Sequence, residues 1–370
     1  MAIADLADPP ADAAWRPVAP AELGFDARAL AEAVAFSAAH EMPWDRDLGK
    51  QIATGMFEPA PYNEILGPTG TRGAVKGLVL RHGRIAAEWG ETTTPEMTFS
   101  VAKSYLSALA GIAQADGLIG DLDEPIGRRV ADGGFEGPHN GAITWRQLLQ
   151  QTSEWEGTLW DKPDWIDRGR VVDASEKTKT MDRVLEAPGS YWEYNDIRVN
   201  RLALALLRLY RRALPDVARE RLMDPLGCSA SWTWHGYRNS WVEIDGRQVQ
   251  SVSGGGHWGG GIVIHARDQA RFGQLYLNRG RWNGRQILPE RWIAESTTPC
   301  PLNPGYGFMW WLNADGVRLP SAPRESFMAV GAGGNLVYID PSRDMVVVTR
   351  WLDTAHQDAF IAQVQAALKG

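Results

Sequence analysis

The sequence lacks several features that would point to particular classes of protein. Only two cysteines, Cys228 and Cys300, occur among 370 residues, too few for a disulfide framework. Acidic residues outnumber basic ones and the formal net charge is −7, which argues against a surface built to bind nucleic acid. No segment offers the roughly 18 uncharged apolar residues of a membrane-spanning helix. Neither a nucleic acid nor a membrane is therefore an expected partner.

Histidine is scarce as well, and the seven that occur show no close pair with metal-ligand spacing. We therefore expect no metal. The first ten residues have neither a basic start nor an uninterrupted apolar stretch, so we do not expect them to act as a signal peptide or anchor. Together with the absence of a disulfide framework, this favours a cytoplasmic protein. The composition leaves the oligomeric state open, with a homodimer as one option.

Tryptophan, in contrast, is abundant. Seventeen occur, many of them in turn-rich segments where they could wall an apolar cleft. Trp155, Trp160 and Trp258 are candidates for contact with a ligand. The first two begin a segment, residues 154–183, that is rich in Trp, Asp, Lys and Arg and has little periodicity, which is typical of a loop or lid.

Hydrophobic patterning predicts strands near both ends of the chain and helices in its middle. Residues 75–90 predict a β-hairpin, and residues 335–339 and 345–350 predict neighbouring strands. Helices are expected over residues 26–40, 100–115, 145–149, 200–210, 268–277 and 358–368. The predicted fold is α+β, an α/β sandwich whose antiparallel sheet is built from both chain ends and flanked by helices, with a mostly helical inserted domain.

This order of elements suggests domain boundaries. Residues 1–25 are expected to form an N-terminal arm, and residues 26–115 and 250–370 the α/β domain with the central sheet. Residues 116–249 are then the helical insertion that carries the lid loop.

The sequence Ser100-Val101-Ala102-Lys103 contains a hydroxyl nucleophile and an amine that could activate it. Residues at i and i+3 share one helix face, so the Lys103 side chain can lie beside the Ser100 hydroxyl. A serine hydroxyl is a weak nucleophile until a neighbour takes its proton. If Ser100 begins a helix, its backbone N–H and the positive end of the helix dipole point toward an oxyanion formed there. An N-capping serine followed by a solvated lysine is the alternative.

Further motifs follow in order. Tyr194-Asn195-Asp196 comes after Pro188-Gly189, and Gly331-Ala332-Gly333-Gly334 precedes a predicted strand. With Thr152-Ser153 and the glycine-rich run 259–261, this series resembles the class C β-lactamase and penicillin-binding-protein superfamily of serine hydrolases, over about residues 75–350. Its character is similar to that of the esterases and 6-aminohexanoate-dimer hydrolases of the superfamily.

The resemblance implies a role for each matching residue. Ser100 would be the acylated nucleophile, Lys103 would polarise it, and Tyr194 would act as general base and then as general acid toward the leaving group. The backbone N–H groups of Ser100 and Ala332 would form the oxyanion hole. No cofactor is implied.

Two positions depart from the family pattern. Ala329-Val330-Gly331 stands where a cationic Lys-Thr-Gly or a His-x-Gly is usual, and Asp196 stands where Asn is usual. Both changes favour a neutral or cationic substrate over an anionic one. The candidate substrate-binding residues are Asp196, Trp155, Trp160, His257, Trp258, Gly331 and Gly333.

The expected function is hydrolysis of a small ester or amide. Alternatives are a β-lactamase, a D-amino peptidase, or a non-catalytic relative that binds a ligand or acts as a scaffold. His257 is read first as a turn histidine packed on Trp258 and second as part of the cleft. An acid of the lid, which includes Asp161 and Asp167, could bind an amino terminus.

Overall fold

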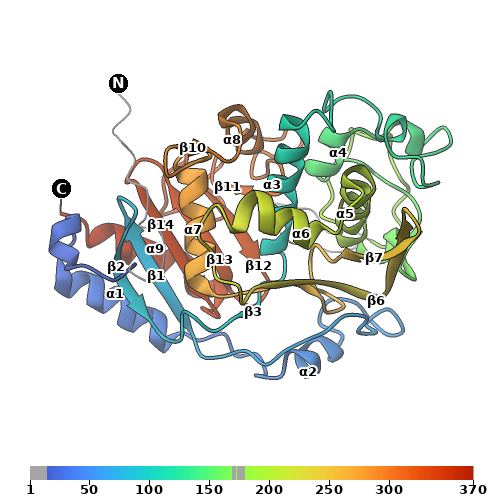
Figure 1. Cartoon of the computed structure of the whole chain (residues 1–370). Coiled ribbons are helices and arrows are strands. Elements are labelled where there is room, and N and C mark those ends of the chain that lie inside the picture. The colour runs from blue at the N-terminus through green and yellow to red at the C-terminus, as the bar shows by residue number, and fades with distance from the viewer. Residues whose placement is uncertain (1–14, 169–171, 173–179, 370) are drawn as a thin grey trace.

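A central six-stranded antiparallel sheet organises the structure, a computed structural model that describes residues 15–168, 172 and 180–369. Figure 1 shows this sheet with helices on both of its faces. Its order is β11-β12-β13-β14-β1-β2. The strands are β1 (Lys76–Arg81), β2 (Arg84–Trp89), β11 (Trp311–Leu312), β12 (Phe327–Gly331), β13 (Asn335–Asp340) and β14 (Met345–Arg350).

The two ends of the chain meet in the middle of this sheet, because β1 pairs with β14. Val79 lies opposite Val347, and Leu80 lies opposite Val346. Neighbouring residues of a strand point to opposite faces, so each strand supplies two hydrophobic clusters. The predicted sheet built from both chain ends is confirmed, as are the 75–90 hairpin and the pairing of β13 with β14.

Helices cover the two faces. On one face α7 (Ala266–Leu277) packs against β1, β13 and β14. On the other, α1 (Ala27–Ala39) and α9 (Gln357–Ala366) pack together beside β2 (Figure 1). The Asp26 side chain caps α1 by accepting from the backbone N–H groups of Arg28 and Ala29, as the sequence predicts.

A second, helix-rich region lies beside the sheet. It contains α3 (Val101–Ala115), α4 (Trp145–Leu149), α5 (Asp196–Tyr210) and α6 (Leu214–Ala218). A capping box at Thr144 and Gln147 starts α4 where the sequence predicts it. Helix α5 begins four residues before the expected start, because the Asn195 side chain accepts from the Arg198 backbone N–H and caps it.

A four-stranded sheet of order β3-β8-β6-β7 completes this region. Its strands are β3 (Glu96–Met97), β6 (Thr233–Ile244), β7 (Arg247–Val252) and β8 (Gly261–Ile264). Strand β6 and the start of β7 fall inside the segment 116–249 that the sequence assigned to a helical insertion. The aromatic and β-branched residues of β6 suit a pleated surface, which explains the difference. The domain boundaries themselves stay a prediction.

Residues 15–25 pack on the β1–β2 hairpin, where the Trp15 indole N–H donates to the Gly83 carbonyl. The remaining elements are short. The longest described helices, α3 and α5, have 15 residues each, and none of the described helices combines the length and apolarity that a membrane crossing needs. The short elements include α2 (Leu48–Ala53), α8 (Glu290–Ser296), β4 (Thr158–Leu159), β5 (Lys162–Pro163), β9 (Arg281–Trp282), β10 (Arg285–Gln286) and the 3-10 turn η4 (Asp164–Asp167).

Candidate active site

Ser100 stands at the N-terminus of the buried helix α3. Phe99, just before it, has φ of 50°, in the left-handed region that bulky residues rarely adopt. The Phe99 ring is buried and makes edge contacts with Trp44 and Trp351, so packing holds this turn in place. The turn brings the Ser100 hydroxyl to a cavity wall at the positive end of the α3 dipole.

Lys103 lies one turn further along α3, with its ammonium group buried. Its Nζ is 2.8 Å from Ser100 Oγ, 2.5 Å from Asp196 Oδ1 and 3.3 Å from the Gly254 carbonyl oxygen. The juxtaposition of Ser100 and Lys103 that the i, i+3 spacing predicts is therefore present. Lys103 Nζ also lies 4.9 Å from the centre of the Tyr194 ring.

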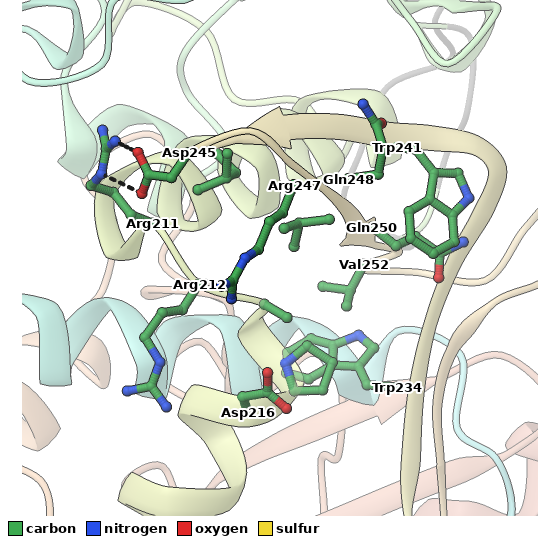
Figure 2. A pocket seen from close by; sticks show the side chains of 14 residues that line it. Arg211, Arg212, Asp216, Trp234, Trp241, Asp245, Arg247, Gln248, Gln250 and Val252 are labelled. Carbon is green, nitrogen blue, oxygen red and sulfur yellow. Dashed lines mark hydrogen bonds and ion pairs between the residues drawn. The ribbon is translucent and has the colours of Figure 1, made fainter.

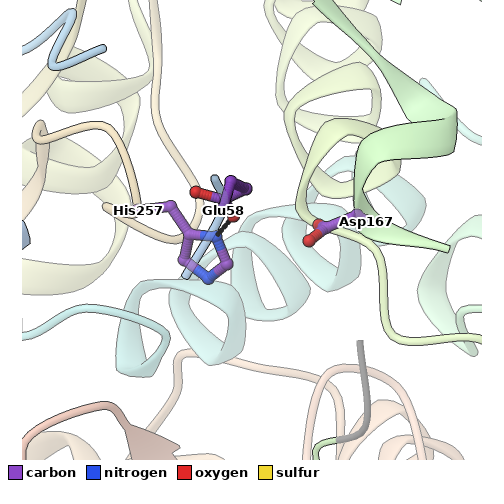
Figure 3. A group of neighbouring side chains, drawn as sticks. All are labelled: Glu58, Asp167 and His257. Carbon is purple, nitrogen blue, oxygen red and sulfur yellow. Dashed lines mark hydrogen bonds and ion pairs between the residues drawn. The ribbon is translucent and has the colours of Figure 1, made fainter. Parts of the chain in front are cut away.

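His257 extends this polar group on the side away from Ser100. Its Nε2 is 2.6 Å from Asp196 Oδ2, and its Nδ1 is 2.5 Å from Glu58 Oε1. Figure 3 shows the Glu58 carboxylate joined to the His257 ring and the Asp167 carboxylate to the right of both. The possible ligand atoms of these three residues lie within 4.8 Å of one another, a spacing that a metal site would need. Because both nitrogens of His257 face carboxylates, we interpret the group as a hydrogen-bonded cluster.

Asp196 does not face the cavity. Its carboxylate lies between Lys103 and His257, is 1% exposed, and does not line the described wall of the cavity. Asp167, from the predicted lid, is also buried and accepts the Asp196 backbone N–H at 2.5 Å. Both carboxylates are thus engaged inside the protein, and the expectations that Asp196 repels an anionic substrate and that an acid of the lid binds an amino terminus stay predictions.

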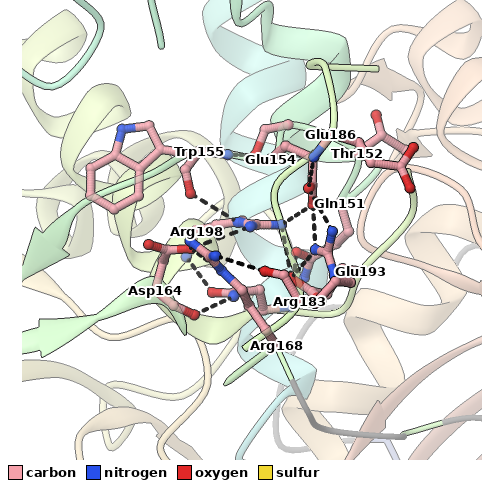
Figure 4. Close-up of polar contacts among 12 residues, drawn as sticks. Gln151, Thr152, Glu154, Trp155, Asp164, Arg168, Arg183, Glu186, Glu193 and Arg198 are labelled. Atoms are coloured by element: carbon pink, nitrogen blue, oxygen red, sulfur yellow. Dashed lines mark hydrogen bonds and ion pairs between the residues drawn. The ribbon is translucent and has the colours of Figure 1, made fainter. Parts of the chain in front are cut away.

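Tyr194 enters the site from the segment before α5. Its ring stacks on Trp311 with centroids 5.5 Å apart and planes at 24°. The preceding residue, Glu193, belongs to a buried ionic cluster with Glu154, Arg183 and Arg198 (Figure 4). This cluster ties the predicted lid segment to α5 and so fixes the backbone on which Tyr194 stands.

The third motif closes the site from the edge of the central sheet. A Cβ atom on Gly331 would lie 2.0 Å from the Thr98 carbonyl oxygen, so only glycine lets β12 approach the segment that leads to Ser100. Ala332 follows at the cavity wall. Ala329 is buried, packs in the core, and does not line the cavity. Gly333, with φ of 78°, packs against the rings of Trp351 and Trp44 rather than on the described cavity wall.

Arg350, on β14, connects several of the segments that form the site. Its buried guanidinium donates to the carbonyls of Met97 and Ile264, at 2.7 and 3.0 Å, and to the Asn335 side chain. The Asn335 amide in turn donates to the Ala332 carbonyl at 2.6 Å. One arginine therefore links β3, β8 and β14 to the turn that presents Ala332.

These elements enclose a cavity of about 420 Å³, within the range of small-molecule sites. Its wall includes Ser100 and Tyr194 together with His257, and Arg318 stands over the Trp311 ring at 3.8 Å. The described lining residues are Met56, Phe57, Ser100, Val172, Tyr194, His257, Trp311, Arg318, Val330, Gly331, Ala332 and Thr354.

Three predicted ligand contacts lie elsewhere. Trp155 and Trp258 are buried, and their indole N–H groups donate to the carbonyls of Gly134 and Tyr62. Trp160 packs against the main hydrophobic core. None of the three is among the described residues that line this cavity. Their indoles serve packing, which the abundance of tryptophan in turns does not distinguish from a cleft wall.

Sequence reasoning missed Glu58, Phe57 and Arg318. Glu58 and Phe57 come from a loop without periodicity, and Arg318 comes from a turn between β11 and β12. No motif spacing connects them to Ser100. The one sequence signal near these residues is the high content of turn-forming and aromatic residues, which could have marked the segments as candidate cavity walls.

A second cavity, of about 770 Å³, lies between α6 and the β6–β7 hairpin (Figure 2). Trp234, Trp241 and Arg247 line it, and Arg211 on its wall pairs with Asp245. Its described lining contains no serine, cysteine or histidine, so it offers no nucleophile of the kind found at Ser100.

Comparisons with known proteins show the family of the chain. A family model described as "Beta-lactamase" matches residues 68–360. No curated protein matches the chain in sequence. The structure of a Bacillus anthracis protein assigned as a 6-aminohexanoate-dimer hydrolase has a TM-score of 0.57 and 21% identity, over 79% of this chain and 78% of that one.

Two further structures cover nearly the whole chain. EstCE1, a hydrolase with promiscuous acyltransferase activity, has a TM-score of 0.57 and 18% identity over 93% of this chain and 99% of its own. A penicillin-binding protein homologue from Caulobacter crescentus has a TM-score of 0.59 and 14% identity over 95% and 99%. At these identities the structures show a shared fold, and the family model shows descent. The chain belongs to the beta-lactamase family and is a serine hydrolase.

Proposed function

We propose that the protein hydrolyses a small ester or amide through an acyl-enzyme on Ser100. The observation that carries this proposal is the 2.8 Å contact between Lys103 Nζ and Ser100 Oγ, at the wall of a cavity that Tyr194 also lines. The Lys103 ammonium is buried and is kept charged by its ion pair with Asp196, so a cation lies beside the Ser100 hydroxyl.

The reaction would run in two halves. In the first, Ser100 Oγ bonds to the carbonyl carbon and its proton passes to the phenolate oxygen of Tyr194, whose ring centre is 4.9 Å from Lys103 Nζ. The oxyanion would be stabilised by the backbone N–H groups of Ser100 and Ala332. Tyr194 then gives its proton to the departing alcohol or amine. In the second half, water attacks the acyl-enzyme by the same route and releases the acid.

Charge in the cavity bears on the substrate. Among the described lining residues, Arg318 contributes a permanent cation and no carboxylate is present. Asp196 is buried behind Lys103. The expected preference for a neutral or cationic substrate stays a prediction, and esters with and without a carboxylate test it against the positive charge of Arg318.

Labelling with a fluorophosphonate, followed by peptide mass spectrometry, tests the nucleophile. We expect label on Ser100, and a loss of p-nitrophenyl ester hydrolysis of about 10⁵-fold or more in Ser100→Ala. Ser104→Ala is the matched control, since Ser104 lies one turn further on α3 and bonds only the Met309 carbonyl among the contacts described. Label elsewhere, or unchanged turnover in Ser100→Ala, would overturn the proposed role of Ser100.

A substrate panel then separates the enzymatic alternatives. It contains a short-chain ester, a linear ω-amino amide, a penicillin-type lactam and a D-amino-acid peptide. We expect the ester or the linear amide to have the highest kcat/KM. Fastest turnover of the lactam or the D-peptide would replace the proposal with the corresponding activity.

A further inference from the structure

A continuous polar chain runs from the nucleophile into the protein interior. It passes from Ser100 Oγ to Lys103 Nζ at 2.8 Å, and from Lys103 to Asp196 Oδ1 at 2.5 Å. It continues from Asp196 Oδ2 to His257 Nε2 at 2.6 Å and ends at Glu58, whose Oε1 is 2.5 Å from His257 Nδ1. The four side chains beyond Ser100 are each about 2% exposed. The proposed reaction uses the first part of this chain and leaves His257 and Glu58 unexplained.

We propose that His257 is a positioning residue that stays protonated in the resting enzyme and, through Asp196, sets the charge and position of Lys103. This inference rests on the proposed role of Lys103 beside Ser100. It assigns Glu58 the task of keeping the proton on His257.

Each of the two contacts of His257 needs a proton between the ring nitrogen and the carboxyl oxygen, and the imidazolium form supplies both without protonating a carboxylate. A neutral imidazole has one N–H and one lone pair. Both nitrogens of His257 lie within 2.6 Å of a carboxylate oxygen, and a lone pair pointed at either oxygen would be repelled. The imidazolium form donates to both carboxylates and removes the conflict.

The charges around the ring favour the same form. Among the described residues, three carboxylates, Glu58, Asp167 and Asp196, surround His257, and Lys103 pairs with Asp196. A positive charge on His257 between these carboxylates is favoured over a neutral ring, because buried carboxylates are stabilised by a paired cation.

Other titratable groups also lie near the cluster. Burial raises the pKa of Tyr237, on β6, so that residue stays neutral. Tyr194 faces Lys103 with its ring. Lys162 also interacts electrostatically with Glu58, and it donates to the carbonyls of Tyr62 and Glu64.

The ring cannot turn away from its partners. Phe57 stacks on it with centroids 4.4 Å apart and planes at 5°. The adjoining backbone is equally close, because a Cβ on Gly255 would lie 2.7 Å from Asp196 Oδ2 and 2.8 Å from Lys103 Nζ. The chain therefore has a fixed geometry in which a change of charge at His257 acts on Asp196.

The consequence for Lys103 has a definite sign. Asp196 divides its negative charge between His257 and Lys103. Loss of the positive charge at His257 would leave that negative charge to Lys103 alone, which would keep its proton to higher pH. Loss of the charge at Asp196 would have the opposite effect.

The first test measures the proton on His257 directly by ¹⁵N NMR of histidine-labelled protein. We expect imidazolium shifts for His257 at pH 7.5, and a fall in its pKa of about one unit or more in Glu58→Gln. Its signal is assigned by its loss in His257→Gln or, if that variant does not fold, by the ring-current change in Phe57→Leu. A neutral His257 in the unmodified protein at pH 7 overturns the inference, whatever Ser100 does, so this failure is distinct from failure of the proposed function.

The second test uses the pH–rate profile of ester hydrolysis. In the pH–rate profile, the limb that shifts to lower pH in Asp196→Asn is assigned to the titration of Lys103. His257→Gln should shift this same limb to higher pH by about one unit. In the double variant His257→Gln should have no further effect, because it acts through Asp196. His265→Gln is the matched control, since His265 is a buried histidine that pairs with Asp268 at 3.3 Å on α7, and its profile should be unchanged. An unmoved limb in His257→Gln, or additive shifts in the double variant, contradicts the inference.

Discussion

Replacing Arg198 with methionine should destabilise the protein strongly. The Arg198 guanidinium is buried, lies 2.9 Å from Glu154, 3.1 Å from Glu193 and 3.3 Å from Asp164, and donates to the Trp155 carbonyl at 3.1 Å. Methionine fills much of the volume but leaves these carboxylates short of a buried cation. Removal of one partner from a buried ionic group costs about 3–5 kcal/mol.

The corresponding change in melting temperature can be estimated. Unfolding entropy is about 2.1 cal/mol/K per residue, or roughly 0.8 kcal/mol/K for a chain of this length, so Tm should fall by about 4–6 °C. Differential scanning calorimetry at pH 7.5 measures this shift. Arg211→Met is the control, because the Arg211 pair with Asp245 is exposed and such pairs contribute only about 0–1 kcal/mol. A loss below about 1 kcal/mol in Arg198→Met would refute the idea that the cluster holds the Tyr194 segment.

The same variant should change the acid side of the stability profile. Burial would raise the pKa of Glu154, but Arg183 and Arg198 outweigh it and hold the pKa below its usual range. A carboxyl group with a lowered pKa in the folded state stabilises the fold at pH above its ordinary pKa, and that contribution disappears as the pH falls. Without Arg198 the pKa of Glu154 moves up toward its ordinary value, so the variant should lose less stability than the unmodified protein when the pH falls below the ordinary carboxyl pKa.

Two further substitutions test the cavity. Gly255→Ala places a methyl group less than 3 Å from Asp196 and Lys103, so we expect kcat to fall by about tenfold or more with little change in KM. An unchanged kcat would mean that the reaction does not depend on the exact positions of these two side chains. Arg318→Met should lower kcat/KM for p-nitrophenyl hemisuccinate about tenfold or more relative to p-nitrophenyl butyrate, because a charge-assisted hydrogen bond contributes about 1.5–3 kcal/mol. Equal losses for both esters, or no loss for either, would show that Arg318 does not bind the substrate carboxylate. Arg247→Met, in the second cavity, is the control.

Much of the fold followed from local patterns. Short runs rich in apolar and β-branched residues identified β13 and β14, and capping side chains at Asp26 and Thr144 marked helix starts. These signals act between residues a few positions apart, so they are readable in a linear sequence. β6 was not predicted, because it lies in the segment 116–249, whose other elements are mainly helical and which was therefore assigned as a helical insertion.

For the site, the sequence alone determined the contact between Ser100 and Lys103, because residues three apart on a helix share a face whatever surrounds them. The order of short motifs added Tyr194 and the turn at Ala332. Tertiary structure decided the rest: that Asp196 points inward, that Arg318 reaches the cavity, and that Glu58 meets His257 from 199 positions away. Such contacts depend on how separate segments pack, and no periodicity within either segment encodes them.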